Sequence, residues 1–205
     1  MKTTILSITA LLLLMLSVSC SNDSTMNENP LFEKSSLPFE APNFDSIEIS
    51  HFRDAFDEGI RIQLEEMEAI ASNPEEPSFE NTIVAMERSG ELLQRTSQVF
   101  FNLTSAHTNS EIQEIQAEMA PRLAAHNDNI LLNRELFERV QTLYENREEL
   151  EFDKASMKLL DDTYRSFVRA GALLSDEEQQ RMREINSRVS TLKTQFQENL
   201  LKMTN

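Results

Sequence analysis

The 205-residue chain has 19 Lys and Arg residues against 35 Asp and Glu residues, with three Gly, six Pro, one Cys and no Trp. Its formal net charge of -16 argues against nucleic acid as a partner, because binding to phosphates needs a cationic surface. Helix-favouring residues such as Glu, Gln, Leu, Ala, Met and Arg dominate, so we expect an all-α protein.

The first 19 residues have the composition of a secretory signal peptide. Lys2 provides a positive start, Ile5–Leu16 is an almost unbroken apolar run, and no acidic residue precedes Cys20. The apolar run is too short to span a bilayer stably. We therefore expect residues 1–19 to be a signal peptide.

Cys20 is the only cysteine and stands where such a signal would be cleaved, followed by the polar run SNDSTMNEN. The arrangement resembles a bacterial lipoprotein signal, in which the cysteine carries the lipid, although Ser17 replaces the usual Leu. Lipidation would also remove a free thiol from an oxidising compartment. We expect lipidation at Cys20 and anchoring to a membrane of the bacterial cell envelope, on the periplasmic or outer-membrane side. The alternative is an ordinary signal peptide followed by an incidental cysteine.

The rest of the chain divides into a lead-in and a helical domain. Residues 20–43 are polar and contain Pro30, Pro38 and Pro42, which predicts a tether followed by an extended segment that docks on the first helix. Residues 44–205 are expected to form one helical domain, since apolar residues recur there every three or four positions and no segment alternates like a strand.

Two long helices are expected at the start of this domain. The first begins near Ser50 and ends before the segment Asn73–Pro77. The second begins at Ser78 as N-cap and continues to Phe100, with Gly90 and Ser97 on its apolar side, where small residues would let another helix approach closely.

Four further helices come next in the chain. A capping box of Ser110 and Gln113 predicts the third helix, in which Pro121 predicts a kink or a break. The fourth and fifth helices are expected at residues 133–146 and from about residue 153 to a C-cap at Gly171. A second capping box, Ser175 with Glu178, begins the sixth. The helical pattern continues to Asn205 without a stop signal, so we expect the chain to be truncated inside this helix.

Two apolar stripes admit two interpretations. One includes Val99–Leu103, and the other runs along the sixth helix through Met182, Ile185, Val189, Leu192, Phe196, Leu200 and Met203. Either stripe is able to form a ligand groove, but core packing is the commoner use of such a stripe and is the interpretation we adopt.

No catalytic or metal-binding motif occurs in the chain. Its histidines, His51, His107 and His126, are not followed by Glu and have no second His four residues later, so HExxH is absent. We expect the histidines to form hydrogen bonds at helix ends or between helices. The acidic clusters lack the spacing and the turn glycine of a calcium loop. The chain is therefore assigned no catalytic residue and no metal ligand, and it is expected to be inactive alone.

Six segments in order resemble a known family of enzymes. They are LPFEAPNFDSI (Leu37–Ile47), FRDAFDEGI (Phe52–Ile60), FENTIVAMERSGELLQR (Phe79–Arg95), VFFNLTSAHTN (Val99–Asn109), FVRAGALLS (Phe167–Ser175) and INSRVSTLKTQFQENLL (Ile185–Leu201). Together they resemble the amino-terminal part of bacterial peptidyl-dipeptidases, which are zinc metallopeptidases of the thimet oligopeptidase family. The resemblance covers about residues 29–205.

The resemblance implies more than the motifs do. Members of the family are zincin-like, almost wholly helical and two-lobed around a deep channel, with zinc bound by HExxH and a further Glu in the carboxy-terminal half. It implies that this chain is the amino-terminal helical segment of such an enzyme, that it forms part of the channel wall, and that its missing carboxy-terminal half is the catalytic partner. Substrates would be short oligopeptides that lose dipeptides from their carboxy terminus. The alternative is a complete helical lipoprotein that binds peptides or a partner without catalysis.

Overall fold

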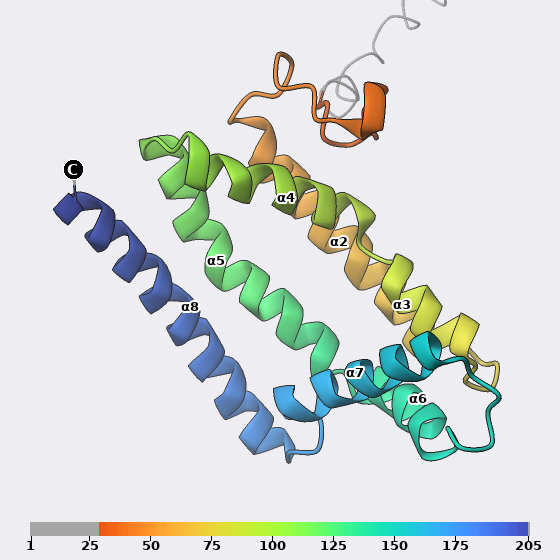
Figure 1. The fold of residues 1–205 in the computed structure, drawn as a ribbon. Coiled ribbons are helices and arrows are strands. Elements are labelled where there is room, and N and C mark those ends of the chain that lie inside the picture. Colours follow the sequence, from red (N-terminus) through yellow and green to blue (C-terminus); the bar gives the residue numbers. More distant parts are fainter. Residues whose placement is uncertain (1–28, 205) are drawn as a thin grey trace, which may run out of the picture.

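The computed structural model describes residues 29–204, which form helices joined by short loops and, within that range, no strand (Figure 1). The expectation of an all-α fold is confirmed. The predicted signal peptide and the predicted lipidation site at Cys20 lie outside the described residues. The elements are η2 (Pro38–Glu40), α2 (His51–Ala71), η3 (Phe79–Val84), α3 (Ala85–Arg88), α4 (Glu91–Ala106), α5 (Ser110–Leu131), α6 (Arg134–Glu145), α7 (Lys154–Ala170) and α8 (Asp176–Thr204).

The long helices lie side by side, and α6 and α7 cross one end of them (Figure 1). Helix α2 packs along α4, α5 contacts both, and α8 runs back along the other side of α5. The contacts of α8 with the rest of the described chain are therefore made mainly through α5.

Two hydrophobic cores hold this arrangement together. The first lies between α2, α4 and the start of α5, and its buried residues are Leu31, Phe52, Ala55, Phe56, Leu93, Val99, Phe100, Ile112, Ile115 and Met119. The second lies between the end of α2, η3, α6 and α7, and its buried residues are Met67, Ile70, Ile83, Leu136, Phe137, Val140, Leu143, Leu160 and Phe167. Helix α2 contributes to both cores, so it links the two ends of the fold. Among the described residues, neither core includes a side chain of α8.

The lead-in docks on the first core. Leu31 is buried there, and the side-chain amide of Asn29 donates to the carbonyl oxygen of His51 at 2.8 Å. The Arg95 guanidinium of α4 donates to the carbonyl oxygens of Leu31 and Phe32 at 3.0 Å. These bonds attach the lead-in to α2 and α4.

One predicted helix is divided. The prediction of a continuous helix from Ser78 to Phe100 is wrong after its first part: Ser78 does cap η3, but α3 ends at Arg88 and α4 begins at Glu91. Gly90 lies between them with a φ of +70°, a left-handed conformation that favours glycine, and its N–H donates to a Glu66 carboxylate oxygen at 2.7 Å. Gly90 therefore separates two helices instead of lining one.

The close approach of helices occurs at a different glycine. Gly59 of α2 is buried, and a Cβ atom added there would lie 2.9 Å from the Cα atom of Leu93 and 3.0 Å from its backbone nitrogen. Both atoms are backbone atoms of α4, so they cannot move aside by a side-chain rotation. Gly59 thus sets the distance between α2 and α4.

Most predicted helix ends are confirmed, with two differences at α5. Asn133 and Asp153 cap α6 and α7, and Gly171 ends α7 with a φ of +108°. The capping box predicted from Ser110 and Gln113 is wrong, because Asn109 caps α5 by accepting the Ile112 N–H at 2.9 Å. The break considered at Pro121 does not occur either.

Helix α5 tolerates Pro121 in its interior. The helix continues past this residue to Leu131. A proline at position 121 cannot donate to the carbonyl group four residues earlier, which belongs to Ala117. Because Ala117 is exposed, water is available to that carbonyl group.

We predict that Gly59→Ala destabilises the fold although alanine favours helices. The added methyl group meets the α4 backbone, and overpacking of this kind costs about 1–3 kcal/mol. The measurement is the free energy of unfolding in urea. Ala69→Ser adds one atom at an exposed position of the same helix and should change it by less than about 0.5 kcal/mol. Equal stability of the two variants would contradict the prediction.

Candidate functional site

Within the described range, no three side chains of His, Cys, Asp or Glu come together in a way that could hold a metal ion. Residues 29–204 also contain no helix long and apolar enough to cross a bilayer. The candidate functional feature of residues 29–204 is an exposed apolar surface on α8.

The three histidines lie at helix ends or between helices, as expected from the sequence. The Nδ1 atom of His51 accepts the Glu48 N–H at 3.0 Å at the start of α2, and His107 comes directly after the last residue of α4. His126 of α5 is buried, and its Nε2 atom lies 2.7 Å from Oε1 of Gln63 on α2. The three side chains belong to separate places in the fold.

His126 is held in a state that disfavours protonation. Its Nε2 atom donates to Gln63, while its Nδ1 atom is buried and has no hydrogen-bond partner among the described residues. A proton on Nδ1 would place an unsatisfied donor and a charge in the interior. Burial accordingly lowers the pKa of His126 below its ordinary value of 6.5.

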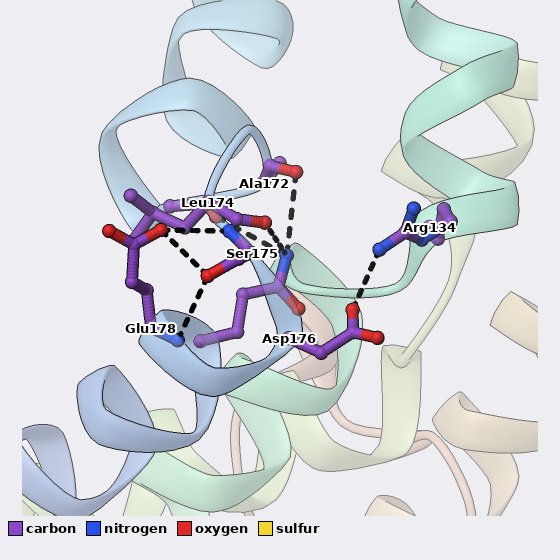
Figure 2. A network of polar contacts seen from close by, with 8 residues as sticks. Arg134, Ala172, Leu174, Ser175, Asp176 and Glu178 are labelled. Carbon is purple, nitrogen blue, oxygen red and sulfur yellow. Dashed lines mark hydrogen bonds and ion pairs between the residues drawn. The ribbon is translucent and has the colours of Figure 1, made fainter.

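The start of α8 is fixed by a network of polar contacts (Figure 2). The predicted capping box is confirmed: Ser175 donates its N–H to a Glu178 carboxylate oxygen at 2.9 Å, and its hydroxyl oxygen accepts the Glu178 N–H at 3.4 Å. The backbone N–H and the hydroxyl of Ser175 lower the pKa of Glu178. Asp176 pairs with Arg134 of α6 at 2.7 Å. The ion pair thus joins the start of α8 to α6.

The side of α8 that faces α5 is polar. The Asn186 amide donates to a carboxylate oxygen of Asp128 on α5 at 2.7 Å, and Asp128 is only 3% exposed. Arg183 donates to the side-chain oxygen of Asn129 at 2.9 Å. Further along, Thr194 is the one residue of α8 that is buried within the described range, and its hydroxyl donates to the Ser190 carbonyl oxygen at 3.2 Å. Hydrogen bonds and small side chains therefore make this contact.

Two clefts border the contact of α5 with α8. One is lined by residues of α5, α7 and α8, namely Ala124, Asn127, Asp128, Ala170, Asn186, Val189, Ser190 and Lys193. The other lies towards the end of α8 and is lined by Thr104, Ser105, Thr108, Gln113, Gln116, Gln197, Glu198 and Leu201. Both linings are mixed, with amide, hydroxyl and charged groups beside a few apolar side chains.

The apolar side of α8 is exposed, and Val189 at its edge also lines the first cleft. The prediction that its stripe packs in the core is wrong, because six of the seven stripe residues are 41% to 85% exposed: Ile185, Val189, Leu192, Phe196, Leu200 and Met203. The other stripe is mostly core, since Val99 and Phe100 are buried and Phe101 is 38% exposed. We call Ile185, Val189, Leu192, Phe196 and Met203 the α8 apolar face.

The comparisons with known proteins agree with the resemblance in the sequence. The chain is 44% identical over 176 residues to a dipeptidyl carboxypeptidase of Salmonella typhimurium. The aligned region covers 86% of this chain and 26% of the relative. It is 43% identical over 173 residues to the dipeptidyl carboxypeptidase of Escherichia coli, with 84% and 25% covered. The chain is homologous to bacterial dipeptidyl carboxypeptidases. An oligopeptidase A of Haemophilus influenzae is 27% identical over 176 residues, with 86% and 25% covered.

These matches extend over most of this chain but only part of each relative. The chain spans about a quarter of the length of the curated relatives it matches. No protein-family model matches the sequence. The relatives are peptidases, and the homology extends over most of the chain, but three quarters of each relative has no counterpart in it.

A second pattern in the sequence, formed by polar residues, indicates which side of α8 packs against α5. The side of the helix opposite the apolar stripe carries Asn186, Ser190 and Thr194 at intervals of four residues. Small polar residues repeated on one side allow close packing against another helix, so two different sides of α8 were suited to contact. The apolar stripe was the stronger of the two signals, and it indicated the wrong side.

We predict that His126 makes the fold less stable as the pH falls below 6.5. Because its pKa is lowered in the folded state, the unfolded chain binds the proton first, so this contribution is complete above pH 6.5 and is lost on acidification towards the folded pKa. Urea unfolding at pH 7.5 and pH 5.5 should show a smaller loss of stability for His126→Gln than for the wild type. His107→Gln, at an exposed histidine, is the control and should behave as the wild type does.

Proposed function

We propose that this chain is the amino-terminal helical segment of an envelope-anchored zinc peptidyl-dipeptidase, which releases dipeptides from the carboxy terminus of short peptides. The observation that supports this function most directly is the 44% identity, over 86% of the chain, to a protein named dipeptidyl carboxypeptidase. The identity to oligopeptidase A is only 27% over the same length. The difference favours dipeptide release over internal cleavage.

In this proposal, the segment forms part of the wall of the substrate channel. Its long helices and two cores provide a rigid body for such a wall. The donor groups of residues 29–204 do not fit a zinc site, since no three of them converge. The zinc of the whole enzyme, which would supply a polarising charge at the scissile bond, is therefore assigned to polypeptide outside this chain.

The second candidate is a helical lipoprotein that binds a peptide or a protein partner without catalysis. The observation in its favour is the α8 apolar face, because exposed groups of apolar side chains mark interaction sites on soluble proteins. The coding sequence beyond residue 205 distinguishes the two candidates. A continuing reading frame with HExxH supports the enzyme, and a stop codon supports the binding protein.

We predict that the product of the complete reading frame releases dipeptides from an oligopeptide with a free carboxy terminus. The same peptide with a carboxy-terminal amide should be cleaved much more slowly, because recognition of the terminal carboxylate is what defines dipeptide release. A chelator should abolish the activity and added zinc should restore it. The 205-residue chain alone should release nothing. Mass spectrometry of the products is the measurement, and release of single residues or of dipeptides from the amino terminus would contradict the proposal.

A separate prediction concerns the membrane anchor. If Cys20 is lipidated, the wild-type protein made in a bacterium with a lipoprotein pathway should incorporate labelled fatty acid and sediment with membranes. Cys20→Ser should lose both properties, because serine offers no thiol for the lipid. The matched control is Ser19→Ala, next to the lipidation position, which keeps the cysteine. Equal labelling of the wild type and Cys20→Ser would show that the cysteine is incidental.

A further inference from the structure

We propose that the α8 apolar face is the docking surface for the polypeptide that makes up the remaining three quarters of the relatives' length, and that this polypeptide covers it with an apolar surface bordered by acidic residues. The inference rests on the proposed function, since it assumes that the whole protein is as long as its relatives. It adds the place on this chain where the remainder binds.

The geometry of α8 is the first argument. The helix is bound to α5 on its polar side, and its apolar face is exposed and belongs to neither core. The face extends from Ile185 to Met203, and Phe196 is 68% exposed. From residue 185 to residue 203 the helix rises about 27 Å, at about 1.5 Å per residue, so the surface suits an elongated partner such as a helix.

The charge around the face favours a partner with an acidic border. From Arg181 to Thr204, the helix has five basic residues and two acidic ones, in a chain whose net charge is -16. Arg188 and Lys193 lie on either side of the apolar face by helical geometry. Neither takes part in an ion pair within the described residues. Acidic side chains at the border of the partner would neutralise them.

A second copy of the chain also suits an apolar face. Two copies each carry a net charge of -16, which disfavours their association. The polypeptide of the same protein is held close by the chain itself, so its effective concentration is high and the repulsion matters less. The length of the relatives indicates that such polypeptide exists.

Thiol labelling of the product of the complete reading frame tests the docking. In a Cys20→Ser background, Phe196→Cys places a thiol on the apolar face, and Ser187→Cys places one on an exposed polar position of the same helix. In the full-length protein, we expect a maleimide to react at least tenfold more slowly at position 196 than at position 187. In the 205-residue chain, both should react at similar rates. Leu192→Cys is a second probe of the face should Phe196→Cys not fold.

Each other outcome overturns the docking proposal. Equal rates at both positions of the full-length protein would show an open face, and a stop codon after Asn205 would remove the partner. A doubled mass of the 205-residue chain with protection of position 196 would indicate a second copy instead. Protection that requires anionic phosphatidylglycerol vesicles would indicate a lipid surface. Peptidase assays on the same preparation separate the two proposals: activity without protection contradicts only the docking, and protection without activity contradicts only the peptidase function.

Discussion

The contact of α8 with α5 is the interaction on which the functional interpretation depends, because it decides which side of α8 faces outward. It is made by a buried carboxylate, Asp128, that accepts from Asn186, and by small side chains such as Ser190 and Thr194. A buried carboxylate needs such a donor, since desolvation without one is costly. With the polar side of α8 engaged in this way, its apolar side is turned to solvent.

The two cores of the described fold are built without side chains of α8. Helix α2 places Phe52 and Phe56 in the first core and Met67 and Ile70 in the second, so one helix connects both. The close approach at Gly59 brings α4 against the middle of α2. Within residues 29–204, α8 is thus added to a body that has its own cores, attached by the Ser175 corner and by the hydrogen bonds to α5.

The sequence predicted the fold well where one apolar side and one cap determine a helix. Asn133, Asp153 and Ser175 cap the expected helices, and the apolar sides of α2, α6 and α7 contribute buried residues to the two cores. It failed where a local conformation or a tertiary contact decides. Gly90 fits a helical stripe by spacing, but its left-handed backbone and its bond to Glu66 end a helix there. Periodicity locates an apolar side without saying whether anything in the same chain covers it.

Homology and the structure give different information about function. Homology connects the chain to peptidases over most of its length, yet residues 29–204 bring together no set of metal ligands. Under the proposed function, residues 29–204 contribute through their shape and through contact with the rest of the enzyme. The α8 apolar face is a surface of that kind, because its exposure to water is unfavourable until an apolar surface covers it. The exposure of this helix face is therefore what the proposed docking of further polypeptide would remove.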